Sequence, residues 1–265
     1  MRASDIVEKF EVIPTPIPLL NEILAGGIPT KLITEIAGPP GVGKSTLALQ
    51  ILAQAQRLGR KTYYADAERA VEFVKFATNI GVDCNELEYD KQDYAEELLE
   101  NIRIWADEHK NGVIVIDAVG ALLGREEAEK PMEGKTIGIQ SKMIAKFCRV
   151  LTPPLDKHNH SLIMVNHIYT VMDTGASKSS GGAKLDYHKG LAIWLKNAYG
   201  KPTKRSSDGT KTVRFVEAEI KNKAKYPNAM DGKKVTLEFI PKVGFVGDYV
   251  SVPVSKRGRP KLTTN

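Results

Sequence analysis

This 265-residue sequence has little of what marks secreted or membrane proteins. Its only two cysteines, Cys84 and Cys148, lie in unrelated contexts, so we expect reduced packing residues and no disulfide framework. No apolar run approaches the roughly 18 residues that a membrane-spanning helix needs, so the sequence predicts no membrane partner. The first residues, MRASDIVEKFEV, also lack the apolar core of a signal peptide. We therefore expect a protein of the cytoplasm.

Positive charge is in excess, and it is unevenly distributed. Lys and Arg number 38 against 32 Asp and Glu, a net charge of +6 with His neutral. The stretch from Lys196 to Lys225 holds nine basic residues against three acids, and Lys256 to Lys261 adds four more. Concentrated positive charge suits a polyanionic partner. A lysine-rich surface that contacts only solvent would have the same composition.

Apolar strands alternate with amphipathic helices along most of the chain. Strand patterns occur at 31–38, 61–68, 112–122 and 161–168, and helix patterns at 44–59, 70–81, 94–109 and 137–151. Strands that are apolar on both faces indicate a parallel sheet covered by helices on both sides. Later strand patterns, at 190–199, 211–222, 233–240 and 243–250, indicate an antiparallel extension. The predicted fold is α/β, with a mostly parallel central sheet.

The segment GPPGVGKS fits the phosphate-binding P-loop pattern GxxxxGK(S/T), and it lies between a predicted strand and a predicted helix. Its glycines let backbone N–H groups surround phosphate oxygens at the start of the helix. We expect Lys44 to reach the β- and γ-phosphates and Ser45 to bind Mg²⁺. The predicted ATP-binding residues are Gly38, Pro39, Pro40, Gly41, Val42, Gly43, Lys44, Ser45 and Thr46. The complete motif in this context argues against a chance glycine turn.

Two carboxylates follow other predicted strands. Asp117 ends VIVID, where a carboxylate can hold Mg²⁺ through its water shell. Asp66 and Glu68 follow YYA, at the edge where ligands bind in open α/β sheets. Hydrolysis of ATP needs a carboxylate that orients the attacking water, and Glu68 is the candidate. An ordinary acid at the start of a helix is the alternative for Glu68.

Together these segments resemble the RecA/RadA recombinase family. ITEIAGPPGVGKSTLALQILAQAQ, YADAE, GVIVIDAVGALL, IMVNHI and GGAKL occur in the family's order, and LLNEILAGGIP resembles the segment before the P-loop in the RadA branch. The resemblance covers residues 17–240. It implies an ATPase of RecA type that forms a homo-oligomeric filament on single-stranded DNA and pairs that strand with homologous duplex DNA.

At the nucleotide site, the resemblance implies that Asp117 is the metal-site aspartate and that Glu68 activates water. Phe76, five residues before GVD, falls where the family stacks an aromatic ring on adenine. A core aromatic in an amphipathic helix explains Phe76 equally well. His167 stands where the family generally has the Gln that senses the γ-phosphate. Its imidazole can donate to a phosphate oxygen, but protonation would make the coupling between ATP and DNA sensitive to pH.

The resemblance also implies two DNA-binding loops. The first runs from the strand that ends in Asn166–His167 to the glycine pair, and we expect no regular structure from Tyr169 to Lys184. Flexible backbone, lysines and apolar side chains suit contacts with phosphates and bases. Its candidate DNA-binding residues are Tyr169, Met172, Lys178, Gly181, Gly182 and Lys184.

The second DNA loop is expected within 124–136, before a helix. Lys142 and Arg149 match basic positions that the family uses along the DNA axis, and their spacing of seven residues places them on one helix face. Met132 and Ile137 are weaker candidates for insertion between bases. Ordinary surface charge is the alternative for the two basic residues.

Two further basic pairs have predicted roles. Lys221 and Lys223 match family lysines that reach the ATP of the neighbouring subunit, where a cation supplied in trans stabilises the transferred phosphoryl group. A solvated strand edge is the alternative. The tail KRGRPK resembles an AT-hook, whose Arg257 and Arg259 would enter a narrow minor groove. A nonspecific basic tail is the alternative there.

We expect three parts: a lead at 1–30 that contributes to oligomerisation, a RecA-like ATPase core at 31–250 and a basic disordered tail at 251–265. The short lead and tail are similar to those of minimal phage recombinases, which suggests the cytoplasm of a bacterium or of a phage-infected cell. The leading hypothesis is a DNA-dependent ATPase that acts as a recombinase. The alternatives are a recombination mediator with weak ATPase activity and a hexameric helicase-type motor that forms rings.

Overall fold

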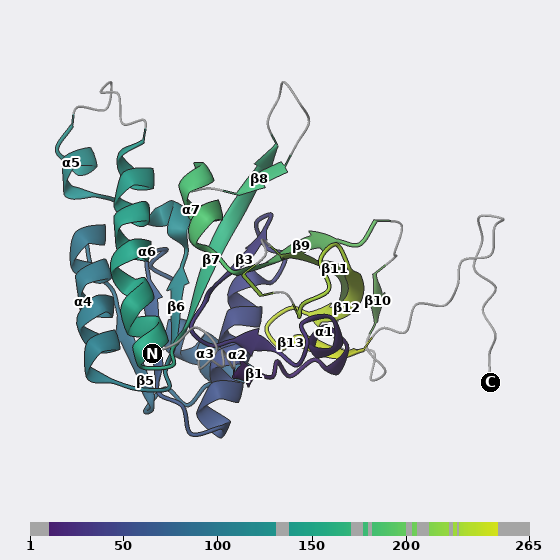
Figure 1. Cartoon of the computed structure of the whole chain (residues 1–265). Coiled ribbons are helices and arrows are strands. Elements are labelled where there is room, and N and C mark those ends of the chain that lie inside the picture. Colours follow the sequence, from purple (N-terminus) through teal and green to yellow (C-terminus); the bar gives the residue numbers. More distant parts are fainter. Residues whose placement is uncertain are drawn as a thin grey trace, which may run out of the picture.

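The computed structural model describes residues 11–130, 138–170, 177–179, 182–199, 203–205, 212–222, 225–226 and 228–248. Its strands are β1 (Val12–Ile13), β2 (Ile28–Pro29), β3 (Ile33–Gly38), β4 (Thr62–Asp66), β5 (Leu87–Asp90), β6 (Val113–Asp117), β7 (Ser161–Thr170), β8 (Ser177–Ser179), β9 (Leu191–Asn197), β10 (Lys204–Arg205), β11 (Thr212–Asn222), β12 (Lys234–Ile240) and β13 (Gly244–Asp248). The main sheet runs β13-β12-β11-β9-β3-β7-β6-β4-β5 (Figure 1). Neighbours from β9 to β5 pair in parallel, whereas β9, β11, β12 and β13 pair antiparallel. The predicted fold class is confirmed.

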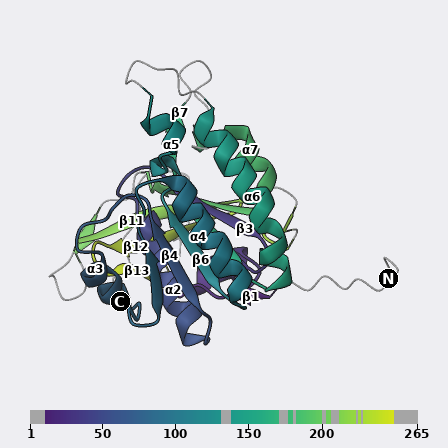
Figure 2. The same cartoon turned by 90° about the vertical axis from the view of Figure 1, so that its left-hand side faces the viewer.

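Helices cover the parallel part of the sheet on both faces (Figures 1 and 2). The helices of the described residues are α1 (Pro18–Ile23), α2 (Lys44–Arg57), α3 (Phe73–Ile80), α4 (Ala95–Glu108), α5 (Arg125–Ala128), α6 (Ile139–Lys157) and α7 (Gly182–His188), with a 3-10 turn at Val119–Ala121. Val113 and Val115 of β6 pack in the cluster with α2 and α3, whereas Ile114 and Ile116 pack with α4 and α6. Burial on both faces is the reason that this strand is apolar throughout.

Two expectations about local structure are wrong. The segment from Tyr169 to Lys184 is not irregular throughout, because β7 continues to Thr170, β8 pairs with it antiparallel and α7 begins at Gly182. Main-chain hydrogen bonds hold this hairpin, so it needs no apolar alternation that a sequence pattern would reveal. The second error is the end of α6, which runs through Pro153 and Pro154 to Lys157.

The described part of the N-terminal lead packs with the core. Val12 and Ile13 pair antiparallel with Ile28 and Pro29 of the same chain. Ile13, Leu20 and Ile28 are completely buried in the cluster that also holds α2. Within the described residues, no helix combines the length and the apolar character required to cross a membrane.

The side chain of Gln50 in α2, the helix that follows the P-loop, hydrogen-bonds to the antiparallel extension of the sheet. The Gln50 amide donates from Nε2 to the Phe245 carbonyl oxygen at 3.0 Å and accepts the Phe245 N–H at 3.1 Å. Both contacts are buried, and 195 residues separate the partners. Gly244 allows the approach, since a Cβ there would lie 2.7 Å from Gln50 Nε2. The position of β13 against α2 therefore depends on Gln50.

We expect Gln50→Leu to lower the free energy of unfolding by about 2 kcal/mol, because it leaves the buried N–H and C=O of Phe245 without partners. Urea titration would measure this loss. The control is Gln54→Leu, on a partly exposed residue of the same helix whose side-chain oxygen accepts a hydrogen bond from the exposed Arg57 side chain. It should change stability by less than about 0.5 kcal/mol. Equal losses in the two variants would contradict the role of Gln50.

Candidate nucleotide and nucleic-acid site

The P-loop segment joins β3 to α2 as a tight turn that requires glycine. Gly41 and Gly43 have φ values of +70° and +107°, in the region that side chains disfavour. A Cβ on Gly43 would lie 2.8 Å from the Phe239 ring and 3.0 Å from the Phe245 ring, so β12 and β13 press against the loop. Backbone N–H groups in such a turn, at the start of a helix, fit a phosphate group.

Arg214 reaches the same loop from β11. Its Nη2 donates to the Gly41 carbonyl oxygen at 3.2 Å, and its Cζ lies 4.9 Å from the centroid of the Phe239 ring. The sequence prediction missed this contact, because 173 residues separate Arg214 from Gly41. Its only sequence signal is one more basic residue in a basic stretch.

His167 lies between Lys44 and Glu68, two of the charged side chains that the sequence predicts for catalysis. In the β3–β7 ladder it stands opposite Gly38, the first residue of the P-loop. Its Nδ1 lies 3.4 Å from Lys44 Nζ, and its Nε2 lies 2.9 Å from Glu68 Oε1. Because Lys44 only donates, Nδ1 accepts and Nε2 carries the proton that faces Glu68. The structure thus brings together three of the predicted catalytic residues.

The environment of Lys44 is buried and acidic. Its Nζ also donates to the Pro39 carbonyl oxygen at 3.0 Å. Burial lowers the pKa of Lys44, while the carboxylates of Asp117 and Glu68 act in the opposite direction. The Lys44 ammonium group therefore has two acceptors, the Pro39 carbonyl oxygen and His167 Nδ1, and a phosphate oxygen can join or replace them.

Asp117 ends β6 with its carboxylate almost completely buried. Its Oδ2 accepts the Tyr64 hydroxyl at 2.5 Å, and the Ser45 side chain also hydrogen-bonds to the carboxylate. Its buried Oδ1 has no hydrogen-bond partner among the described residues. Burial raises the pKa of Asp117; the bonds from Tyr64 and Ser45 oppose this, and the charges of Glu68 and Asp66 add to it.

The residues present fit a Mg²⁺ ion that is bound together with a nucleotide. An unpaired carboxylate oxygen next to the Ser45 hydroxyl offers the hard oxygen ligands that Mg²⁺ prefers. No group of three or more His, Cys, Asp or Glu side chains within the described part of the chain could hold a metal ion by itself. A Mg²⁺ ion held by Ser45 and Asp117 would take its other ligands from phosphates and water.

Glu68 is positioned by hydrogen bonds that fix the loop after β4. Its own N–H donates to the Asp117 carbonyl oxygen at 3.1 Å. Asp66, one of the two acids after YYA, is buried and accepts the Tyr89 hydroxyl at 2.7 Å and the Ala70 N–H at 2.9 Å. Asp66 therefore shapes the loop, and Glu68 remains half-exposed toward His167.

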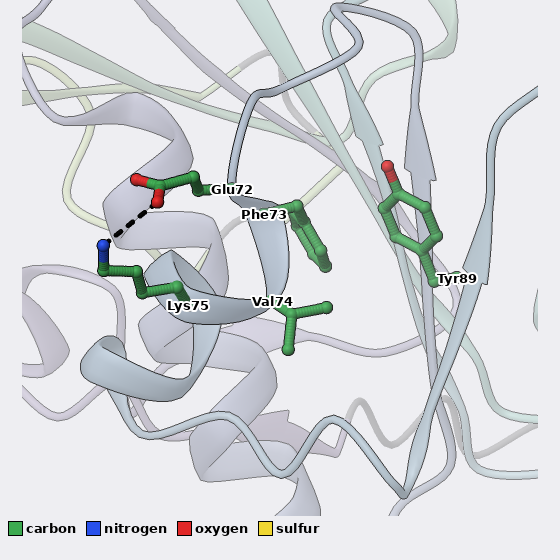
Figure 3. Close-up of a pocket in the computed structure, with 5 residues that line it drawn as sticks. All are labelled: Glu72, Phe73, Val74, Lys75 and Tyr89. Atoms are coloured by element: carbon green, nitrogen blue, oxygen red, sulfur yellow. Dashed lines mark hydrogen bonds and ion pairs between the residues drawn. The ribbon is translucent and has the colours of Figure 1, made fainter.

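Phe76 lies on α3 and packs partly buried against the core. A pocket of about 500 Å³ lies at the start of the same helix, and Phe76 does not line it. Figure 3 shows its lining residues, Glu72, Phe73, Val74, Lys75 and Tyr89. The rings of Phe73 and Tyr89 have centroids 4.5 Å apart. Sequence reasoning passed over both, since neither belongs to a motif.

The candidate DNA-binding residues that the structure describes lie on β7, β8, α6 and α7. Tyr169 and Lys178 stand directly opposite each other in the β7–β8 hairpin, and Tyr169 is 50% exposed. Lys142 and Arg149 are exposed on α6. Gly182 and Lys184 belong to α7, which packs against α6. The other candidates, Met132, Ile137, Met172, Gly181, Arg257 and Arg259, lie outside the described residues.

Lys221 lies on β11, and Lys223 falls outside the described residues. Lys221 Nζ lies 2.5 Å from Glu219 Oε1, and Lys196 Nζ lies 3.4 Å from Glu219 Oε2. Lys221 is therefore paired within its own chain. Sequence reasoning did not anticipate this partner, although the spacing of two residues on a strand places both side chains on one face.

We expect Asp117→Asn to raise the melting temperature in metal-free buffer, because it removes a buried charge that the fold disfavours. Raising the folded-state pKa of a carboxyl group stabilises the wild type most below the unfolded pKa, and this stabilisation is lost as pH rises through the folded pKa. The advantage of the variant should therefore grow as pH rises through the folded pKa of Asp117. Scanning calorimetry across pH checks this, and an advantage that shrinks with rising pH would contradict it.

Comparisons with known proteins find related sequences over most of this chain. A sequence model described as the RecA N-terminal domain matches residues 3–236. The chain is 34% identical over 223 residues to Protein RecA of Thermus aquaticus, covering 83% of this chain and 65% of that protein. It is 32% identical over 243 residues to Protein RecA of Nautilia profundicola, covering 88% and 68%.

A mitochondrial DNA repair protein recA homolog of Dictyostelium discoideum is 33% identical over 224 residues, covering 83% of this chain and 49% of that protein. The chain thus spans about two thirds of the length of the bacterial relatives and half of this one. This match over most of the chain confirms the predicted resemblance, and the protein belongs to the RecA family.

Proposed function

We propose that this chain is a DNA-dependent ATPase that forms filaments on single-stranded DNA and promotes pairing and strand exchange with homologous duplex DNA. The observation that carries the proposal is the place of His167. It contacts Lys44 and Glu68 at the P-loop, and its strand continues into the β7–β8 hairpin that presents Tyr169 and Lys178. One strand therefore links the nucleotide site to a candidate DNA-binding surface.

ATP and Mg²⁺ are the proposed cofactors, and bound Mg²⁺ would neutralise charge on the phosphates. Lys44 and the N–H groups of the P-loop bind and orient the phosphates, while Ser45 and Asp117 would hold the Mg²⁺ ion. Glu68 orients the attacking water and accepts its proton. In the structure, the Glu68 carboxylate accepts from His167 Nε2–H. A γ-phosphate that takes over Lys44 and His167 would release Glu68 for this task.

The proposed DNA contacts combine charge with an exposed aromatic ring. Tyr169 can stack on a base while Lys178, across the hairpin, contacts a phosphate. Lys142 and Arg149 extend the positive charge along α6. These contacts read the backbone and stacking faces of DNA, so the proposal predicts little sequence preference.

Lys221 is the proposed contribution of the neighbouring protomer to each site. A cation that reaches the nucleotide from another chain would make hydrolysis depend on assembly. Within one chain it pairs with Glu219, which is almost completely buried. A nucleotide phosphate with two negative charges can compete for Lys221 on forming a filament.

We expect Glu68→Gln to lower DNA-stimulated ATP hydrolysis by about 100-fold or more, because the amide cannot accept the proton from water. Binding of ATP should remain. Hydrolysis rates with and without single-stranded DNA provide the test, together with electron microscopy of the complexes. The matched control is Glu72→Gln on the same loop, whose exposed carboxylate pairs only with Lys75 among the described contacts. An unchanged rate in Glu68→Gln, or closed rings in place of filaments, would contradict the proposal.

Mixing two inactive variants tests whether Lys221 acts in trans. In an equimolar mixture of Glu68→Gln and Lys221→Met chains, about one junction in four pairs an intact Glu68 with an intact Lys221 of its neighbour. The mixture should therefore recover about a quarter of the wild-type rate. Lys196→Met, which alters another lysine that contacts Glu219, serves as the control and should stay active alone. No recovery in the mixture would place Lys221 in its own chain's site.

A further inference from the structure

A charged pair is buried at Glu35 of β3, three residues before the P-loop, and neither of its members has a role in the proposed hydrolysis. Glu35 of β3 is fully buried, and its Oε2 accepts Lys189 Nζ at 2.5 Å. Lys189 follows α7 directly and is only 2% exposed. Asp186 Oδ1 lies 2.6 Å from the same Nζ, but the Asp186 side chain is 49% exposed. Burial lowers the pKa of Lys189, and the two carboxylates outweigh it, so the net pKa is raised.

The second oxygen of Glu35 connects this pair to the strand that carries His167. Asn166 Nδ2 donates to Glu35 Oε1 at 2.8 Å, and Asn166 Oδ1 accepts the His167 N–H at 2.9 Å. Asn166 is completely buried as well. An unbroken series of hydrogen bonds therefore runs from the backbone N–H of His167 through Asn166 and Glu35 to Lys189.

The residues in this series belong to the P-loop strand, to the strand of His167 and to the end of α7. Glu35 precedes the P-loop by three residues on the same strand, and His167 contacts Lys44 and Glu68. Lys189, the last residue of the series, directly follows α7, and its backbone N–H donates to the Leu185 carbonyl oxygen. The next residue, Gly190, donates to the Ile33 carbonyl oxygen of β3 at 2.8 Å.

Stability alone does not account for a pair in this place. Removing two charges from water costs several kcal/mol per ion, and apolar residues of similar volume commonly stabilise a core at least as well. A buried ion pair with fully used oxygens instead allows one arrangement of its partners. In this protein those partners are the P-loop strand, the strand of His167 and α7.

We propose that the Glu35–Lys189 pair is a positioning device that couples phosphate binding at the P-loop to the placement of α7 and the DNA-binding segment before it. A phosphate that replaces the Lys44–His167 contact displaces the end of β7. Asn166 and Glu35 move together, because the fully buried Glu35 Oε1 would otherwise lose the hydrogen bond from Asn166 Nδ2. A shift of Glu35 then moves Lys189, which is bonded to it, and with Lys189 the end of α7. The inference rests on the proposed function and adds a second path beside the β7–β8 hairpin.

The test uses the double variant Glu35→Gln/Lys189→Met, which keeps the volume but removes both charges. We expect basal ATP hydrolysis within about twofold of the wild type, and stimulation by single-stranded DNA lower by about five- to tenfold. The matched control is Asp186→Asn, which removes only the half-exposed partner of Lys189 and should keep the wild-type stimulation. Stimulation that survives in the double variant, with only a lower melting temperature, would overturn the proposal.

Amide hydrogen exchange on the unaltered protein keeps the proposal testable if the double variant does not fold. A non-hydrolysable ATP analogue, added without DNA, should change the exchange rates of residues 185–189 by about threefold or more. Unchanged rates there would overturn the role of the pair. A wild type that shows no stimulation by DNA would instead contradict the proposed function, and the exchange experiment would still report on the path from nucleotide to α7.

Discussion

The parallel pairing of β3 with β7 sets the geometry of the whole site. Its register places His167 opposite Gly38, and the preceding pairs place Asn166 next to Ala37 and Met164 next to Glu35. A shift by one residue would turn every side chain of β7 to the other face of the sheet. The contact of His167 with Lys44 and Glu68, and that of Asn166 with Glu35, would then both be lost. Nucleotide chemistry in this fold thus depends on strand register.

The apolar faces of the sheet allow the protein to bury charges where chemistry needs them. One cluster packs the sheet against α2 and α3, and the other packs it against α4 and α6. The same structure buries the ionisable side chains of Lys44, Asp117, Glu35 and Lys189, each at most 6% exposed. Such groups cost stability unless they are paired, so the surrounding core must compensate. The desolvation cost is clearest at Asp117, because its Oδ1 has no hydrogen-bond partner among the described residues.

Much of the fold could be read from local patterns in the sequence. The continuous apolar strands, the capping of α2 by the P-loop and the period of the helices follow from short stretches, and the structure has these elements within a few residues. The same holds for the approach of Lys44, Asp117 and Glu68, since parallel strands bring their carboxyl ends to one edge.

What the sequence could not supply depends on contacts between distant residues. The hairpin of β7 and β8 is formed by main-chain bonds in a stretch without apolar alternation. The pairing of Glu35 with Lys189 and that of Gln50 with Phe245 join residues 154 and 195 positions apart. In the sequence, Glu35 is an ordinary acid within a predicted strand, and its neighbouring residues do not indicate that its side chain is buried against a lysine. Such pairs require the topology before they can be recognised.

The bond from Arg214 to Gly41 has a consequence for the direction of one amide. In a trans peptide the C=O and N–H groups point to opposite sides of the chain. By holding the Gly41 oxygen on the side of β11, the guanidinium turns the Val42 N–H away from β11. A strand far along the chain therefore aims a hydrogen-bond donor of the P-loop before any phosphate arrives, which lowers the entropy that binding must remove.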